Sequence, residues 1–169
     1  MKNETAVNYD AIRNDETTTN TVNDASMLTC CRLQLKGHSE PSRRIANRLD
    51  LERYCKELLM DEAMESFRLI CIDAQCRVIC ESEISTGTLS SCDAYPRKIA
   101  AVAILSNAHS VFFAHNHPGG TCSPSAEDIR ATETLQKMLK TFEIRVLDHM
   151  IVTPEGRTYS MAQHGDLYQ

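Results

Sequence analysis

The sequence predicts an α/β protein of the α+β kind, in which a mixed β-sheet packs between helices. The chain has 169 residues, which is one domain's worth and enough to bury a core. Stretches with the helical spacing of apolar residues alternate with short apolar stretches typical of strands, in the order α-β-β-α-β-α-β-β. We assign this domain to residues 39–169.

Residues 1–38 differ from the rest of the chain in composition. They are rich in Asn, Thr and acidic residues, and they show no apolar period. Such a segment has little apolar surface to bury, so we expect a disordered or loosely attached N-terminal arm. Within the arm, the stretch from Cys30 to Leu35 is a candidate edge strand.

The first half of the domain predicts a helix followed by a hairpin. The helix is expected from Pro41 to about residue 64. Residues 67–72 form a strand that is apolar on both faces, and residues 78–84 form its antiparallel partner, which Gly87 ends. The positions that give the helix its apolar stripe are Ile45, Leu49, Tyr54, Leu58 and Leu59.

The second half alternates helices and strands. A helix begins at Pro96 and runs to about Asn107, and a buried strand covers residues 111–115. A second helix starts near Ser125, and strands over residues 144–152 and 158–160 complete the sheet. The apolar face of the second helix is expected to comprise Ile129, Leu135, Met138, Leu139 and Phe142.

Charge and hydropathy argue against two classes of function. The formal net charge is −5, whereas nucleic-acid binders usually show a basic field. The densest basic group, Arg43, Arg44 and Arg48, is expected on one solvated helix face among acidic residues. No apolar run reaches the roughly 20 residues of a membrane span. The N-terminus lacks the pattern of a signal peptide, so we expect a cytoplasmic protein.

The chain contains eight cysteines but no C-x-x-C pair. A zinc ribbon or a thioredoxin-type motif is therefore unsupported. Several of the cysteines lie in apolar strand patterns, where we expect them to act as small core residues rather than to form disulfides.

Two histidines stand at the end of the strand expected over residues 111–115. Side chains alternate along a strand, so His115 and His117 leave it on one face, about 7 Å apart along the backbone. Pro118 then ends the strand, and the first turn of the next helix returns Asp128 towards the pair. Two imidazoles and one carboxylate, with a fourth position left for water, are typical of a catalytic Zn²⁺ site.

Each of these residues also has a simpler interpretation. A lone histidine near a strand end is usually a polar residue whose hydrogen bonds are made within the protein. Ser125 and Asp128 form an S-x-x-D pattern, which is typical of a helix capping box. For Ser125, capping is at least as well supported as a chemical role. The metal interpretation of Asp128 depends on the histidine pair, because the whole pattern is far more specific than its parts.

The stretch from His115 to Asp128 resembles the JAMM motif of the JAB/MPN metalloprotease superfamily, H-x-H-x(10)-D with an embedded S-x-x-D. The segments HNHPGG…PSAEDI and LDHMIVT are similar to RadC-like proteins in particular. The resemblance runs from about Glu65 to the C-terminus and implies a JAB/MPN-like fold with cytidine-deaminase-like architecture. The sequence departs from the family pattern at Gly119, where Ser is usual, and at Lys98, where Glu is typical.

The resemblance implies roles for two further residues. Glu65 matches the family's E-x-F position, whose glutamate acts as general base on the metal-bound water. Ser125 would help to stabilise the oxyanion of a tetrahedral intermediate. The pair Asp148-His149 could form a second metal site or support the first, and a buried structural pair is favoured. From spacing alone, the competitors of Glu65 are Glu62, Glu81 and Glu83.

The resemblance favours a zinc metallopeptidase-like hydrolase that cleaves a peptide or isopeptide bond in a peptide or protein substrate. One alternative is a DNA-repair-associated RadC-like protein that acts on or with DNA, and the acidic charge balance argues against it. The other is a non-catalytic interaction module with a vestigial site. All the residues needed for the metal and the water are present, which argues against the module. The sequence leaves the oligomeric state open.

Overall fold

The computed structural model describes residues 43–87 and 95–167. The arm expected at residues 1–38 and its candidate edge strand lie outside the described residues. The same holds for Pro41, where the first helix was expected to begin.

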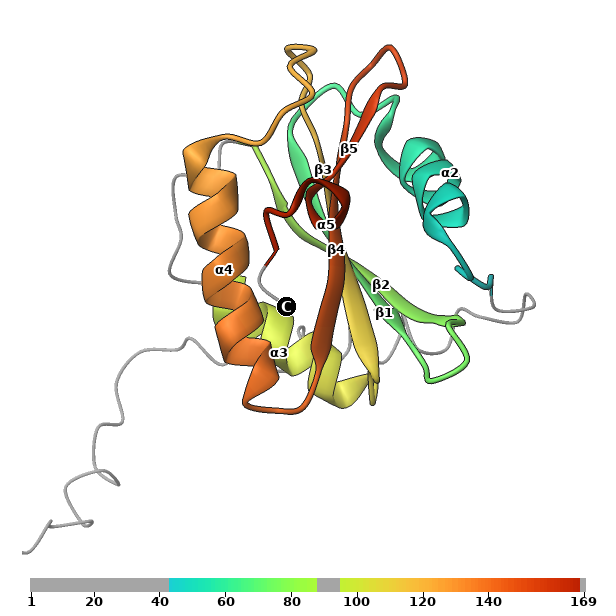
Figure 1. Cartoon of the computed structure of the whole chain (residues 1–169), viewed down its shortest axis with the longest axis vertical. Helices are drawn as coiled ribbons and strands as arrows, with labels where there is room; N and C mark the ends of the chain where they lie inside the picture. The colour runs from blue at the N-terminus through green and yellow to red at the C-terminus, as the bar shows by residue number, and fades with distance from the viewer. Residues whose placement is uncertain (1–42, 88–94, 168–169) are drawn as a thin grey trace, which may run out of the picture.

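In the part of the chain that the structure describes, five strands form one mixed sheet (Figure 1). They are β1 (Ser66–Ile72), β2 (Val78–Thr86), β3 (Ser110–Asn116), β4 (Arg145–Val152) and β5 (Thr158–Ser160). Their order across the sheet is β2-β1-β3-β4-β5. β3 and β4 are parallel, and the other neighbours are antiparallel. The predicted mixed sheet is confirmed, and each strand predicted within the described residues is found.

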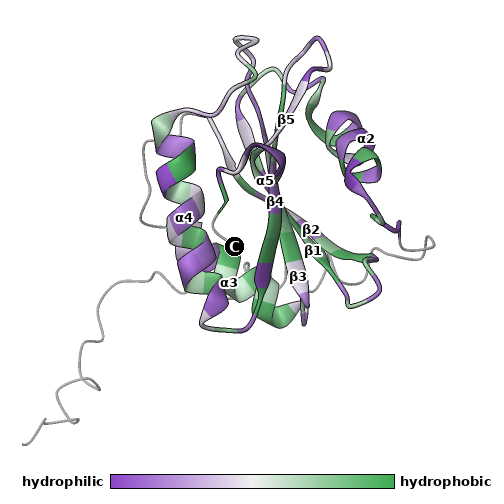
Figure 2. Ribbon diagram, in the orientation of Figure 1, coloured by the Kyte–Doolittle hydropathy of each residue, from purple (hydrophilic) through white to green (hydrophobic). Residues whose placement is uncertain are grey.

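Helices cover both faces of this sheet. They are α2 (Arg48–Leu59), α3 (Tyr95–Leu105), α4 (Ala126–Lys140) and α5 (Met161–His164). α2 lies on one face, and α3 and α4 lie on the other (Figure 1). Because side chains alternate along a strand, Leu69 and Phe113 face one core, which α3 and α4 complete, while Ile70 and Phe112 face the other, which α2 completes. Figure 2 shows hydrophilic and hydrophobic residues alternating along α4, one face of which meets the sheet.

The first helix begins later than predicted, and it ends at Leu59 rather than near residue 64. It starts at Arg48, where the Asn47 side chain caps it by accepting a hydrogen bond from the Asp50 N–H. The capping residue in extended conformation stops the helix from reaching back towards Pro41.

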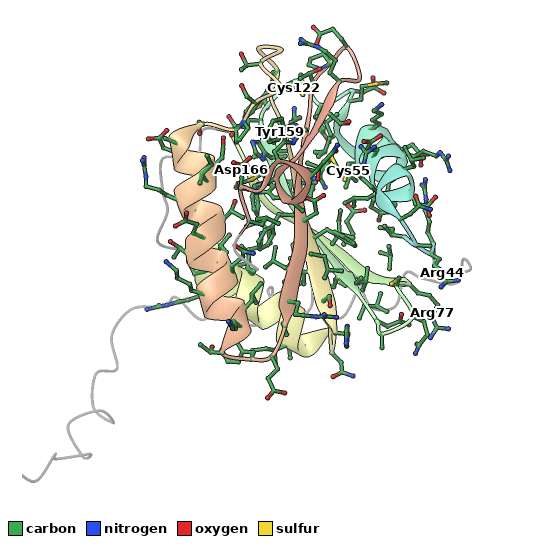
Figure 3. All side chains as sticks on the ribbon, in the orientation of Figure 1. Arg44, Cys55, Arg77, Cys122, Tyr159 and Asp166 are labelled. Atoms are coloured by element: carbon green, nitrogen blue, oxygen red, sulfur yellow. The ribbon has the colours of Figure 1, made fainter. Side chains whose placement is uncertain are left out.

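The residues before this cap run beside the β1–β2 hairpin. Arg44 forms an antiparallel bridge with Arg77 of the hairpin, and both are labelled in Figure 3. Arg43 forms an ion pair with Glu57. The prediction that Arg43 and Arg44 share a helix face with Arg48 is therefore wrong, because long-range strand pairing holds them in an extended segment.

Two residues predicted to lie in apolar helix faces are exposed, and one helix was missed. Leu49, expected in the apolar stripe of the first helix, is 60% exposed. Phe142 is 48% exposed and does not join the apolar face of α4. The helix ends at Lys140, and Ile144 reaches the core instead. The short helix α5 was not predicted. It follows β5 directly, is capped by the Ser160 side chain, and ends at Gly165 in the left-handed conformation, with φ 83°.

The described cysteines are free thiols. Cys55, Cys71 and Cys80 are buried, which confirms the prediction that cysteines fill the core. Cys76 and Cys122 are half-buried, and Cys122 is labelled in Figure 3. Among the helices that the structure describes, none is long and apolar enough to cross a membrane.

Candidate metal centre

His115 and His117 leave the end of β3 towards one point, as predicted. Their Nε2 atoms lie 2.8 Å apart. The side chain of His115 is fully buried, whereas 17% of the His117 side chain is exposed. Gly120, at a left-handed φ of 80°, donates its N–H to the His117 carbonyl at 2.9 Å and closes the turn. The carbonyl of Thr121 lies 2.6 Å from the His117 Nδ1 and can only accept, so Nδ1 carries a hydrogen.

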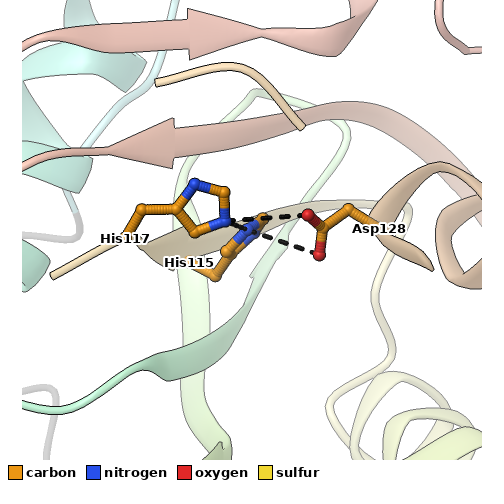
Figure 4. Close-up of side chains that lie close together, drawn as sticks. All are labelled: His115, His117 and Asp128. Carbon is orange, nitrogen blue, oxygen red and sulfur yellow. Dashed lines mark hydrogen bonds and ion pairs between the residues drawn. The ribbon is translucent and has the colours of Figure 1, made fainter. Parts of the chain in front are cut away.

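Asp128 completes the group from the first turn of α4. Its Oδ1 lies 3.5 Å from the His115 Nε2, and its Oδ2 lies 3.6 Å from the His117 Nε2 (Figure 4). The possible ligand atoms of the three residues all lie within 4.8 Å of one another. Two imidazole nitrogens and a carboxylate oxygen that converge from a strand end and a helix start form a donor set suited to zinc.

The electrostatics of the group favour a cation between its members. Because His117 donates through Nδ1, its neutral ring turns an Nε2 lone pair towards the Nε2 of His115. A metal ion, or in its absence a proton on His117, is then needed between the two nitrogens. Burial alone would raise the pKa of Asp128, but its contacts with His115 and His117 outweigh burial and lower that pKa. The neighbouring Asp128 carboxylate raises the pKa of His117. These residues therefore fit a divalent metal ion.

Ser125 forms the capping box that its spacing predicts. Its Oγ accepts a hydrogen bond from the Asp128 N–H at 3.1 Å and donates its hydrogen to the Asp128 Oδ2 at 2.7 Å. The Ser125 N–H donates to the same oxygen at 2.8 Å. The cap therefore has a second effect, since it orients the carboxylate that faces the histidines.

Glu65 lies immediately before β1 and is half-buried. The Asp128 carboxylate is the main cause of the raised pKa of His117, and the charge of Glu65 acts in the same direction. The three competing carboxylates all contact Arg68, with Glu62 at 3.0 Å, Glu81 at 3.7 Å and Glu83 at 2.8 Å. Among the four candidates, Glu65 is the one whose charge acts on His117, whereas the other three pair with Arg68.

Asp148 and His149 are both buried on β4, but their side chains make separate contacts. Asp148 accepts hydrogen bonds from Ser160 and Ala162 and anchors the start of α5. His149 lies behind the metal centre, with its Nε2 2.8 Å from the Nδ1 of His115. The structural role favoured from the sequence thus fits Asp148. His149 makes the support contact that the sequence left as an alternative, and no second metal group is found among the described residues.

Sequence reasoning missed two residues that touch this site. Thr132, one turn after Asp128 on α4, contacts the Nδ1 of His149 at 2.7 Å. Asn116, between the two histidines, is buried and bonds the backbone of the segment before β1. The spacing of Thr132 from Asp128 was a usable signal, because residues four apart share a helix face. Asn116 carried no such local signal.

The fold and the site together define a class of protein. It is a mixed α/β domain in which the end of one central strand and the start of the following helix bring two histidines and one aspartate together as a group that could hold a metal ion.

Comparison with known proteins identifies the family. The model of the RadC-like JAB domain matches residues 45–166. A UPF0758 protein of Cellvibrio japonicus (strain Ueda107) is 41% identical over 112 residues, which are 66% of this chain and 50% of that protein. One of Herminiimonas arsenicoxydans is 41% identical over 117 residues, 69% of this chain and 52% of that protein. The chain belongs to the RadC-like JAB family, and it spans about half the length of the curated relatives it matches.

Proposed function

We propose that the domain is a zinc-dependent metallohydrolase that cleaves a peptide or isopeptide bond in a protein substrate. The observation that carries the proposal is the convergence of His115, His117 and Asp128, whose ligand atoms lie within 4.8 Å of one another. Zinc held by these residues would supply Lewis acidity, which lowers the pKa of a water to about 7 and polarises the scissile carbonyl. Membership of the RadC-like JAB family supports this chemistry.

Side chains of the protein carry out the remaining steps. We assign Glu65 as the general base, whose carboxylate takes a proton from the attacking water and later passes it to the leaving amine. Ser125 is the proposed donor to the oxyanion. In the structure its hydroxyl hydrogen points to Asp128, so an oxyanion role requires that hydrogen to turn towards the substrate.

Elemental analysis tests the metal part of the proposal. Wild-type protein is purified without chelator, once without added metal and once with zinc supplementation. We expect about one zinc per chain, and loss of most of it in His117→Ala, since three protein ligands leave little redundancy. His109→Ala is the matched control, because His109 is exposed and stands before the opposite end of β3. This variant should keep its zinc.

Zinc-loaded wild type is then assayed against a library of peptides and isopeptide-linked peptides. We expect cleavage by the wild type and by His109→Ala, and none by His117→Ala. Wild-type protein that holds no metal after supplementation would contradict the metal site. Zinc-loaded protein that cleaves neither class of bond would contradict the hydrolase.

A further inference from the structure

His149 lies behind the metal centre and is almost completely enclosed, with 1% of its surface exposed. Phe67 and Phe113 pack against its ring at steep angles of 84° and 74°. These contacts hold the imidazole in one orientation. Its two ring nitrogens then meet one partner each, the Nδ1 of His115 at 2.8 Å and the Oγ1 of Thr132 at 2.7 Å.

Thr132 determines which nitrogen of His149 carries a hydrogen. The Thr132 hydroxyl has a single hydrogen, and the backbone carbonyl of Asp128, which can only accept, lies 2.6 Å away. The sulfur of Met161 is a weaker acceptor and lies farther away, at 3.8 Å. The hydroxyl hydrogen of Thr132 is therefore donated to the backbone carbonyl of Asp128. The hydroxyl oxygen of Thr132 accepts a hydrogen bond from the Nδ1 of His149. Consequently the Nδ1 of His149 carries a hydrogen.

The same reasoning extends from His149 to His115. The ring of His149 is buried, and neither of its hydrogen-bond partners is a carboxylate, which favours the neutral form. A neutral imidazole with its hydrogen on Nδ1 is an acceptor at Nε2, so the Nδ1 of His115 donates to it. When Nδ1 is the nitrogen of His115 that carries the hydrogen, its Nε2 keeps a lone pair for a metal ion. This atom is the one that faces His117 and Asp128.

We propose that Thr132 and His149 form a buried hydrogen-bond relay that fixes His115 in the Nδ1–H tautomer and presents its Nε2 as a metal ligand. Both are positioning residues that act through His115, and the inference rests on the metal site of the proposed function. Partners of this kind fix the tautomer and ring orientation of a ligating histidine. The relay starts at the carbonyl of Asp128, so the helix turn that carries one ligand also orients another.

Nuclear magnetic resonance of metal-free protein with nitrogen-15-labelled histidines reads the tautomers directly, because protonated and unprotonated ring nitrogens resonate far apart. In the wild type we expect a hydrogen on the Nδ1 of both His115 and His149. A His115 that carries its hydrogen on Nε2 would overturn the relay. This measurement needs neither metal nor substrate.

Variants at Thr132 test whether the relay prepares the site for metal. Thr132→Val keeps the shape but removes the acceptor, so we expect altered tautomers at both histidines and a zinc affinity about 10–100-fold lower. Affinity is measured by titration with zinc alone against a competing chelator. Thr132→Ser keeps the hydroxyl and should restore both readouts. Thr134→Val is the matched control, because Thr134 makes the same type of bond to a carbonyl one turn back but is exposed.

Unchanged tautomers and unchanged affinity in Thr132→Val would overturn the relay. If Thr132→Val does not fold, the test rests on Thr132→Ser and on the wild-type spectrum. Altered tautomers or a lower zinc affinity in the serine variant would count against the relay. Wild-type protein that shows both expected tautomers but takes up no zinc would support the relay and contradict the proposed function. The two failures are thus distinguishable.

Discussion

The side-chain oxygen of Asn116 accepts a buried hydrogen bond from the backbone N–H of Ser66 at 2.7 Å, across 50 positions of sequence. The amide nitrogen of Asn116 donates to the carbonyls of Glu62 and Met64, each at 3.0 Å. Asn116 stands between the two histidines of the metal centre, and the segment it holds includes Glu65. One side chain therefore ties the proposed general base to the strand that carries the proposed ligands.

Replacing Asn116 should loosen this connection. Asn116→Ala leaves the buried N–H of Ser66 without its acceptor, and we expect the free energy of unfolding to fall by about 1–3 kcal/mol. The zinc content should stay near that of the wild type, because β3 and α4 still place the ligands, while hydrolysis falls through displacement of Glu65. Denaturant unfolding, elemental analysis and peptide cleavage check the three parts. Unchanged stability would show that the hydrogen bonds of Asn116 contribute little.

Glu65→Gln should keep zinc and lose hydrolysis. Glutamine fills nearly the same volume but cannot take the proton from water, so the rate should fall by about 10²–10⁴-fold. Glu83→Gln is the control, since Glu83 pairs with Arg68 and should leave cleavage unchanged. Zinc lost together with activity would make Glu65 a ligand or a structural support. Full activity of Glu65→Gln would assign the base to another carboxylate.

Two substitutions at Ser125 separate capping from catalysis. Ser125→Ala removes the cap of α4, and we expect a loss of about 0.5–2 kcal/mol in the free energy of unfolding. Ser125→Asn keeps a good capping side chain but has no hydroxyl. If the hydroxyl donates to the oxyanion, the Asn variant should lose turnover while its thermal stability stays near the wild type. Full turnover in that variant would leave Ser125 as a cap alone.

Asp148 should make stability depend on pH. Burial raises the pKa of its carboxyl above the ordinary 3.8, although hydrogen bonds from Ser160 and from the N–H groups of Ala162 and His149 act in the opposite direction. The folded state then binds the proton more tightly than the unfolded state, so this contribution is present at low pH and is lost as the pH rises through the folded-state pKa. The stability of the wild type relative to Asp148→Asn should fall over that range. Chemical unfolding at a series of pH values measures it, and a constant difference would contradict the expectation.

Arg157 should stabilise the loop after His117. Its guanidinium donates to the carbonyl of Gly120 at 2.7 Å and lies 3.4 Å from Glu155. In Arg157→Ala we expect faster amide hydrogen exchange at Gly120, whose N–H closes the turn onto the His117 carbonyl. Arg130→Ala, which removes an exposed pair on α4, serves as the comparison. Equal exchange rates in the two variants would show that the loop holds its shape without Arg157.

The sequence by itself determined the three proposed ligands, because their relationship is local. His115 and His117 are two residues apart on one strand, so alternation puts them on one side. Asp128 follows in the first turn of the next helix, where the S-x-x-D cap places it. Most strands and helices were predictable for the same reason, since apolar periodicity reports which face of an element is buried.

Only the tertiary structure decided what surrounds those ligands. His149 contacts His115 across 34 positions of sequence, and Asn116 reaches Ser66 across 50. Periodicity shows which face of a strand is apolar but not which strands are neighbours. These contacts therefore exist only once β1, β3 and β4 pair in that order. The start of α2 was missed for the same reason, because a bridge between Arg44 and the distant Arg77 holds the preceding residues extended.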